Sequence, residues 1–113
     1  MRALQRNRRA EAYAIANASG AATAVINIPI GPSWEVKQIS ISTGTSATLP
    51  SAATYVGTSS AGIFLSSTLV GNSDTDSFPN ITVRSGESLC CVWSLVTVGV
   101  QCKMTVVYDE VGY

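Results

Sequence analysis

The side chains best suited to catalysis are few in this sequence and lie far apart. The chain of 113 residues contains no histidine, which is the commonest general base and a frequent zinc ligand. Its seven acidic residues are scattered, apart from Asp109 and Glu110 near the C-terminus and the pair Asp74 and Asp76. No glycine-rich phosphate loop of the GxxxxGK[ST] or GxGxxG type occurs. The sequence therefore predicts a protein that is not an enzyme, has no catalytic residues and binds no cofactor or small-molecule substrate.

The three cysteines are the next candidates for chemistry. Cys90 and Cys91 are adjacent in a strand-like segment, so their side chains would point to opposite faces. If residues 97–100 form a tight turn, the position opposite Cys91 lies near 106 and not at Cys102. Without CxxC spacing or a histidine, the three do not make a zinc site. We expect buried free thiols in a protein assembled in a reducing cytoplasm, with a disulfide as the alternative.

One segment resembles the beginning of a calcium-binding loop. Asn72, Asp74 and Asp76 alternate as the first oxygen ligands of an EF-hand do. The glycine and glutamate that would complete such a loop are replaced by Ser77 and Val83. We therefore interpret this segment as a solvated turn and predict no metal site.

Basic residues are concentrated at the N-terminus. Four of the seven are arginines within the first nine positions, namely Arg2, Arg6, Arg8 and Arg9. This segment carries a charge of about +4 and the remainder about −4, which the net charge of zero conceals. A short basic arm on an acidic body is typical of a segment that docks onto another surface.

Three interpretations of this arm are open. It is a weak candidate for nucleic-acid binding, because four arginines without interleaved aromatic residues offer few contacts besides phosphate. It could be a solvated tail. The third interpretation, which we favour, is docking onto an acidic protein surface through arginine–carboxylate contacts, with Tyr13 as an exposed aromatic beside them.

The conformation of the arm is ambiguous from sequence. Alanine occupies every even position from Ala10 to Ala18, and this period of two favours a strand over residues 11–19. The alternatives are an alanine-rich helix there and a short helix over the preceding arginines. We assign residues 1–20 to an arm and residues 21–113 to a single β-sandwich domain.

Most of the chain after residue 20 has the periodicity of β-strands. Trp34 and Val36 are out of phase with Ile39 and Ile41, which predicts a β-bulge near Lys37. Strands are expected in the following segments, with a polar loop over 71–77, a turn at 85–87 and a reversal at Gly99: 21–30, 34–43, 53–56, 63–70, 78–84, 89–95 and 100–108.

Seven to eight strands without a convincing helix predict an all-β fold, an antiparallel, jelly-roll-like β-sandwich. Charged residues make up only 12% of the chain, so its polar surface consists largely of serine and threonine. Such a surface favours protein–protein contact within an assembly. No run approaches the ~20 apolar residues of a membrane span, and the start makes a poor signal peptide.

The stretch from Ala21 to Tyr108 resembles small β-sandwich virion proteins of tailed bacteriophages. The features that carry the resemblance are Gly31, Trp34 and Val36 in IPIGPSWEVKQISIST, the ATYVG segment, the Ser-Gly-Glu turn of ITVRSGESLCCVWS and the closing strand VQCKMTVVYDE. Such proteins decorate or cement capsids, or belong to head fibres and tails.

The resemblance implies a structural protein of the virion, assembled in the host cytoplasm. Its partners would be the major capsid protein and further copies of itself, without direct contact to nucleic acid or membrane. The arm, with Arg2, Arg6, Arg8, Arg9 and Tyr13, would anchor it to the shell. Deleting residues 1–10 is then expected to abolish attachment and leave the fold intact. The alternatives are a tail or fibre component that binds host-surface carbohydrate and, third, an exported adhesin or pilus-like subunit.

Overall fold

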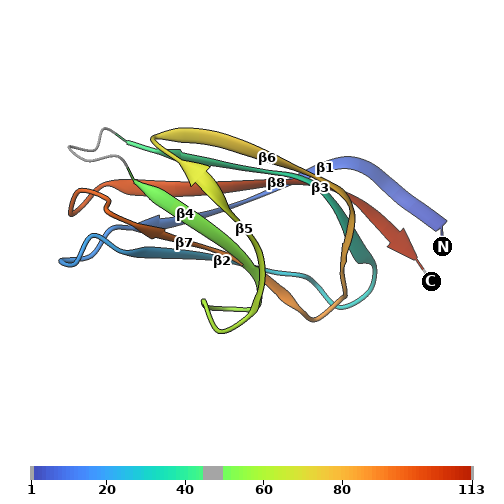
Figure 1. Ribbon diagram of the computed structural model, residues 1–113. Helices are drawn as coiled ribbons and strands as arrows, with labels where there is room; N and C mark the ends of the chain where they lie inside the picture. Colours follow the sequence, from blue (N-terminus) through green and yellow to red (C-terminus); the bar gives the residue numbers. More distant parts are fainter. Residues whose placement is uncertain (1, 45–49, 113) are drawn as a thin grey trace.

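The protein is an eight-stranded antiparallel β-sandwich, as the sequence predicted. The computed structural model describes residues 2–44 and 50–112 (Figure 1). Its strands are β1 (Arg2–Ile15), β2 (Ala22–Asn27), β3 (Ser33–Thr43), β4 (Ser51–Val56), β5 (Ile63–Val70), β6 (Ser73–Val83), β7 (Ser88–Ser94) and β8 (Gln101–Gly112). Among these described residues there is no helix long and apolar enough to cross a membrane.

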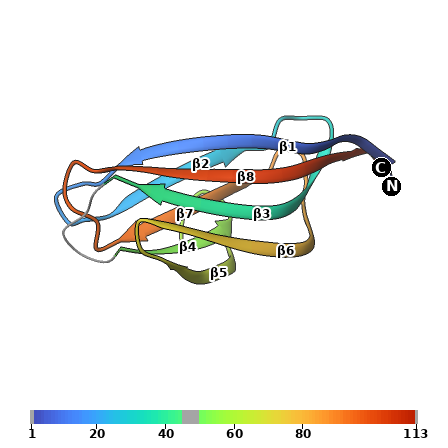
Figure 2. The ribbon, with the colours of Figure 1, turned by 90° about the horizontal axis from the view of Figure 1, so that it is seen from above.

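The strands form two four-stranded sheets with the orders β1-β8-β3-β6 and β2-β7-β4-β5. Figure 2 looks onto the first sheet, with the second beneath it. First and last strands pair, as do β2 with β7, β3 with β6 and β4 with β5. This is the pattern of one long hairpin rolled up on itself, which is the jelly-roll topology.

Alternating apolar residues of both sheets fill the space between the layers. Trp93 and Leu89 from β7 are fully buried, as are Val36, Ile39 and Val106 from the facing sheet. The bulge predicted near Lys37 is confirmed, because the pairing of β3 with both neighbouring strands shifts between Val36 and Gln38. The extra residue brings the two halves of β3 into one phase, so that both contribute to the core.

The segment predicted to be an arm is a strand of the sandwich. β1 pairs with β8 from Arg2 opposite Gly112 to Ile15 opposite Gln101, so the helical alternatives are wrong. The alanines of its inner face pack against the core at Ala10, Ala12 and Ala14. Residues 2–15 therefore belong to the first sheet rather than to a separate arm of residues 1–20. Pairing satisfies backbone groups that a free arm would leave to water.

The strand expected over residues 11–19 ends at Ile15. Beyond it the chain turns around Asn17, whose side-chain Oδ1 accepts hydrogen bonds from the backbone N–H groups of Ser19 and Ala21 at 3.0 and 3.1 Å. An asparagine that bonds the backbone two residues on is a common turn-forming device. The strand therefore ends at Ile15, although the alternation of alanines in the sequence continues to Ala18.

The polar segment expected to be a loop over residues 71–77 is mostly strand. Only the turn at Gly71 and Asn72 separates β5 from β6, which begins at Ser73. Ser73 to Ser77 pair with β3, which gives their backbone groups partners at an edge of the sheet. Pairing in the tertiary structure thus overrides the turn preference of Asp, Asn and Ser.

The last two strands do not form the hairpin that the sequence suggested. β7 lies in the second sheet between β2 and β4, whereas β8 lies in the first sheet between β1 and β3. The connection from Leu95 to Val100 therefore crosses from one layer to the other. The expected register of Cys91 opposite position 106 is wrong for this reason.

Both ends of the described chain lie at the same end of an elongated molecule of 45 × 21 × 19 Å (Figure 1). Arg2 pairs with Gly112 there. The strand expected over residues 21–30 ends at Asn27, and Ile30 lies in the connection to β3 and is 87% exposed.

Candidate functional site

The predicted partner-binding residues lie along β1, but they do not form one patch. Arg8 and Arg9 are both exposed and, as neighbours in a strand, point to opposite faces of the sheet. Arg9 shares the outer face with Tyr13. The backbones of Arg2 and Arg6 belong to the same strand, while their side chains lie outside the described part of the structure. Strand pairing thus divides what the sequence presented as one cluster.

Arg8 lies at the open end of the sandwich, beside an aromatic stack. The rings of Trp34 and Tyr108 are parallel to within 11°, with centroids 3.6 Å apart. A hollow of about 210 Å³ beside them is lined by both rings, Arg8, Glu110 and two prolines, Pro29 and Pro32. Arg8 is therefore part of a site built from three segments of the chain, namely β1, residues 29–34 and β8.

The electrostatics of this hollow affect the Tyr108 hydroxyl. Burial raises its pKa above the usual value of a tyrosine, and the negative charge of Glu110 raises it further. Arg8 opposes both effects through its charge and a hydrogen bond to the hydroxyl. The Tyr108 hydroxyl therefore keeps its proton at neutral pH, and its environment does not favour proton transfer.

The outer face of β1 carries a small polar cluster. The Tyr13 hydroxyl donates to Glu11 Oε2 at 2.8 Å, and Lys103 Nζ of β8 lies 3.8 Å from the same oxygen. The hydrogen bond to Glu11 raises the pKa of Tyr13. Arg9 is the next residue on this face before Glu11, and it is exposed. Tyr13 is 55% exposed, so this face offers a cation and an aromatic ring to a partner.

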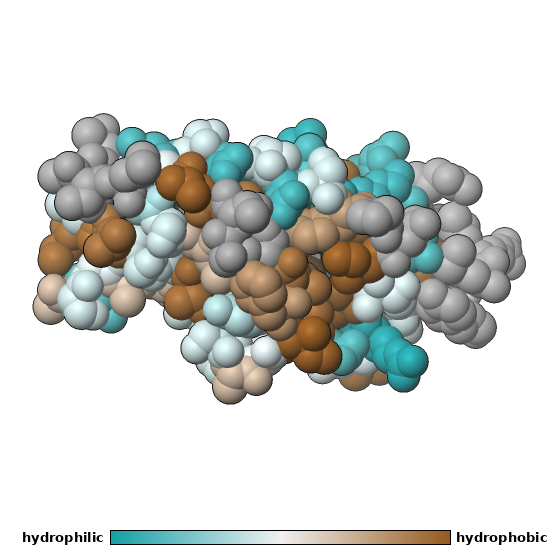
Figure 3. Space-filling model, in the orientation of Figure 1, coloured by the Kyte–Doolittle hydropathy of each residue, from teal (hydrophilic) through white to brown (hydrophobic). Residues whose placement is uncertain are grey.

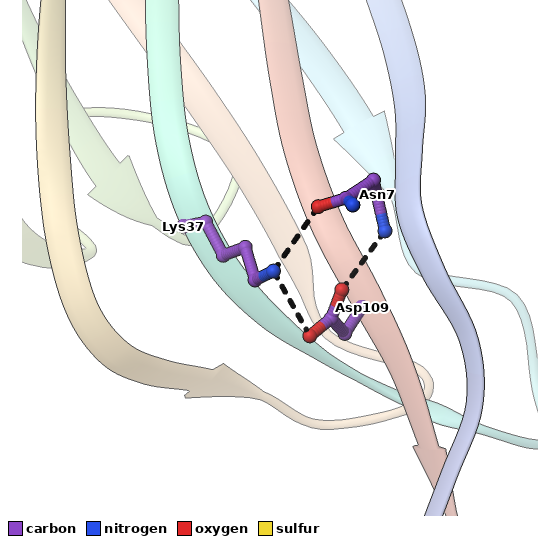
Figure 4. Close-up of polar contacts among 3 residues, drawn as sticks. All are labelled: Asn7, Lys37 and Asp109. Atoms are coloured by element: carbon purple, nitrogen blue, oxygen red, sulfur yellow. Dashed lines mark hydrogen bonds and ion pairs between the residues drawn. The ribbon is translucent and has the colours of Figure 1, made fainter.

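The N-terminal half of β1 is held by a polar cluster that the sequence analysis did not identify (Figure 4). The backbone N–H of Asn7 donates to Asp109 Oδ1 at 2.9 Å. Lys37 Nζ lies 3.3 Å from Asp109 Oδ2 and donates to Asn7 Oδ1 at 3.1 Å. The Asp109 side chain is 9% exposed and that of Lys37 is 44% exposed, so the carboxylate is shielded from water while the ammonium group remains partly solvated. Three strands meet at one carboxylate.

Two bulges create this cluster. Asn7 has a φ of 53°, and the pairing of β1 with β8 shifts between Gln5 and Arg8. The bulge of β3 places Lys37 on the other side of the same carboxylate. Asparagine tolerates the left-handed conformation better than most residues. The β3 bulge was predictable from the phase of its apolar residues, whereas no periodic signal marked Asn7 or Asp109.

Two of the three residues that alternate like calcium ligands form local hydrogen bonds: Asn72 Oδ1 accepts one from the Thr43 hydroxyl at 2.9 Å, and Asp74 bonds the backbone. Asp74 accepts hydrogen bonds from the N–H groups of Val70 and Thr75, at 3.0 and 2.8 Å, across the turn between β5 and β6. Across residues 2–44 and 50–112, no three acidic or sulfur side chains gather as a metal site requires. Asp74 thus stabilises a turn.

All three cysteines are free and buried. Burial raises the pKa of each thiol, most strongly that of Cys91, which the neighbouring sulfur groups raise further. A nucleophilic cysteine needs the opposite, a lowered pKa and access to solvent. The structure therefore gives them the properties of packing residues, in agreement with the expectation of free thiols.

The charged residues are distributed unequally over the two sheets. All fourteen charged residues lie within the described ranges: five on β1, two each on β3 and β6, three on β8, and Arg84 and Glu87 in the turn before β7. The sheet β2-β7-β4-β5 carries none. Sequence order hides this division, because the strands of the two sheets are interleaved along the chain.

A polar hollow lies near the turn that carries Arg84. It has a volume of about 650 Å³ and is lined by Ser33, Thr82, Arg84 and Ser85. Hydroxyls with one guanidinium offer hydrogen bonds to an anion or a sugar.

No protein-family model matches this sequence, and no curated protein matches it. Among solved structures, a chain of the acidic stable capsid structure of Helicobacter pylori bacteriophage KHP30 is similar, with a TM-score of 0.58 and 16% identity over 96% of this chain and 94% of that chain. PirA has a TM-score of 0.45 and 14% identity over 88% and 92% of the two chains. A family 6 carbohydrate-binding module has a TM-score of 0.44 and 16% identity over 98% and 92%. At these identities the likeness concerns the fold alone, and only the first TM-score is high enough to carry it.

Proposed function

We propose that the protein is a structural component of a bacteriophage virion that binds the outside of an assembled capsid as a decoration or cement subunit. Its partners are the major capsid protein and other copies of the chain. The observation that carries the proposal is the chain-long likeness in fold to a chain of a phage capsid structure, with almost complete coverage of both. The resemblance of its sequence to small virion proteins supports the same role.

The surface of β1 supports a binding role rather than a catalytic one. Arg9 and Tyr13 project from an edge strand that Ala10, Ala12 and Ala14 anchor to the core. A guanidinium can bind a carboxylate through two parallel hydrogen bonds, and an exposed aromatic ring contributes apolar contact. Because β1 is already ordered, docking would cost less conformational entropy than ordering a free arm.

The proposed mechanism is stabilisation by linkage. A subunit that binds only the assembled lattice stabilises it by mass action, by about 2.7 kcal/mol per site when its free concentration is a hundred times the dissociation constant. No covalent chemistry is needed. The shell would then dissociate or melt at a higher temperature when the protein is bound.

Co-sedimentation with purified heads tests this role. Heads are first stripped of the protein and then incubated with the wild-type chain or the variants R9E and Y13A. We expect wild-type binding to raise the disruption temperature of the heads, and both variants to bind at least tenfold more weakly. R84E is the matched control, because it changes the net charge equally at an exposed position outside β1.

Gold-labelled antibody on intact virions supplies the decisive localisation. Label distributed over the heads agrees with the proposal, whereas label confined to tails contradicts it. Equal binding of wild type, R9E and Y13A would overturn the assignment of β1 as the docking strand, whereas the localisation tests the capsid role itself.

A carbohydrate-binding role on a tail or fibre is the second candidate. The observation that favours it is the polar hollow at Ser33, Thr82, Arg84 and Ser85, which offers hydroxyl groups and a cation to a sugar. The two tryptophans speak against it, because Trp34 stacks on Tyr108 and Trp93 is fully buried. Binding to a glycan array that is lost in R84A, together with tail label, would favour this candidate.

A further inference from the structure

The outer face of the uncharged sheet is the most unusual surface of the molecule. Side chains on this face alternate with those of the core along each strand, and they meet in rows across the sheet. Val25, Cys90 and Tyr55 form one row that continues to Phe64. Thr23, Val92 and Ala53 form the next row. The rows are bordered by hydroxyl and amide groups, of which Ser51 and Ser94 bond each other at 2.9 Å and Ser88 donates to Asn27.

This face carries both a projection and a depression. Phe64 is 54% exposed, and its ring centroid lies 5.7 Å from that of Tyr55, with the two rings tilted by 60°. On the other side of Tyr55, a hollow of about 200 Å³ is lined by Ser51, Ala53, Val92 and Ser94. Figure 3 shows apolar surface gathered around the beginning of β5. Projection and depression thus lie on one face, one on each side of Tyr55.

We propose that this face binds a second copy of the chain, and that the contact has twofold symmetry. In such a contact the same patch serves both subunits, so a charge near the axis meets its own copy. The outer face of the sheet β2-β7-β4-β5 carries no charge and avoids that repulsion, whereas the outer face of the other sheet carries charged residues. Serine hydroxyls can both donate and accept, so they too can pair with their own copies. An axis near Tyr55 would place each Phe64 ring over the hollow of the other subunit.

The size of the face indicates a weak, transient contact. Four strands about 4.8 Å apart and about six residues long cover roughly 400 Å², below the ~800 Å² that each partner contributes to a standard interface. Interfaces below the standard size are typical of weak complexes, so we expect a dimer with a dissociation constant of about 0.1–1 mM. The inference rests on the proposed function for its setting, because a weak contact becomes effective between subunits that a lattice already holds close together.

Sedimentation velocity of the full chain over a concentration series tests the inference. The wild type should shift from monomer to dimer as its concentration approaches about 1 mM. T23E and A53E place a charge on the face and should remain monomeric throughout. S42E is the matched control, since it adds the same charge to the outer face of the other sheet, and it should dimerise as the wild type does.

Circular dichroism and thermal melting verify that each variant is folded, and F64S offers a second route that introduces no charge. A wild type that stays monomeric at about 1 mM would overturn the inference and leave the face to a different protein. Dimerisation that is unchanged in T23E, A53E and F64S would overturn it equally. The proposed function fails separately: chains that dimerise but do not bind heads contradict the capsid role, and chains that bind heads but never dimerise contradict only this contact.

Discussion

Asp109 is a single carboxylate that joins three strands, and its neighbour Tyr108 shows how much the bulges change. The two residues point to opposite faces, with Tyr108 in the aromatic stack and Asp109 between Asn7 and Lys37. In a regular sheet this outward position would be open to water. The bulged residues of the neighbouring strands cover it instead. One acid therefore links the arginine-bearing half of β1 to both β8 and β3.

Replacing Asp109 tests this role directly. D109A removes the acceptor of the Asn7 N–H and leaves the Lys37 ammonium without this partner, so we expect the free energy of unfolding to fall by about 1–3 kcal/mol. Backbone amides near Asn7 should also exchange with solvent faster, as hydrogen–deuterium exchange would record. D109N keeps an acceptor and should be milder. E110A serves as the control at the next position, and an equal effect there would contradict the assignment.

The buried thiol of Cys91 is expected to make the free energy of unfolding depend on pH in the alkaline range. Burial holds its folded pKa well above the value of about 8.5 for an exposed thiol. Above that value the unfolded thiol loses its proton while the folded one keeps it, so the unfolded state binds fewer protons and stability falls as pH rises. The slope for one such group approaches about 1.4 kcal/mol per pH unit. Below pH ~8 this contribution is fully present.

Chemical denaturation between pH 7 and pH 10 measures this slope. We expect C91A to lower stability at every pH, because it removes buried volume, but to show a shallower decline above pH ~8.5 than the wild type. Since the test compares slopes, the lost packing does not obscure it. Parallel curves for the two proteins would show that the thiol does not titrate differently in the folded state.

Among the connecting elements, the crossing from β7 to β8 is held close to the turn between β1 and β2. The N–H of Val96 donates to the carbonyl of Gly20 at 3.0 Å, and the N–H of Gly99 donates to that of Ala16 at the same distance. Gly20 and Gly99 have nearly equal φ values of 78° and 83°. They differ in their surroundings: a Cβ on Gly20 would lie 2.8 Å from the Val96 carbonyl oxygen, and one on Gly99 would meet nothing within 4 Å.

This pair of glycines separates backbone conformation from crowding. Both G20A and G99A incur the cost of a left-handed alanine, about 1 kcal/mol. G20A must in addition displace the backbone of the crossing, so we expect it to lose at least about 1 kcal/mol more. Thermal melting of the two variants gives the comparison. Equal melting temperatures would mean that the connection between β7 and β8 moves away from the new Cβ atom without a loss of stability.

Which elements the sequence could predict depended on whether local pattern or tertiary pairing determined them. The bulge of β3 was predictable because Trp34 and Ile41 must both reach the core. The second half of β6 was expected as a strand over 78–84, but its first half was not, since the polar residues around Asp74 prefer turns and become a strand only by pairing with β3. The place of β1 was also hidden: its alanines fit a strand or a helix, and only β8 decides between them.

The docking residues illustrate the same limit. The sequence singled out the arginines but could not reveal that Arg8 and Arg9 face opposite sides, because this follows from strand pairing. The Asn7–Lys37–Asp109 cluster brings together residues from three distant segments. Deletion of residues 1–10 was expected to leave the fold intact, yet it would remove pairing partners of β8 and expose a new sheet edge. Substitutions such as R9E are therefore the cleaner test.

At the scale of the whole molecule, one sheet holds nearly all of the charge and the other none, which predicts opposite responses to salt. Binding of heads through β1 should weaken as ionic strength rises from about 0.05 to 0.5 M, because salt screens exposed charges. Self-association through the uncharged sheet should stay constant or strengthen. Co-sedimentation and sedimentation velocity across the same salt series measure the two. A parallel weakening of both would contradict this division of roles.

The pairing of Arg2 with Gly112 places these two residues side by side although they are far apart in sequence. A short linker could join its ends, and the exposed turn at residues 58–61 could be opened to give a circularly permuted protein with the same sandwich. In that permutant the arginines of β1 would sit in the middle of the polypeptide. The permutant keeps every side chain on the sheet but changes the position of these arginines along the chain. Binding by the permutant would therefore show that their position on the sheet is what matters.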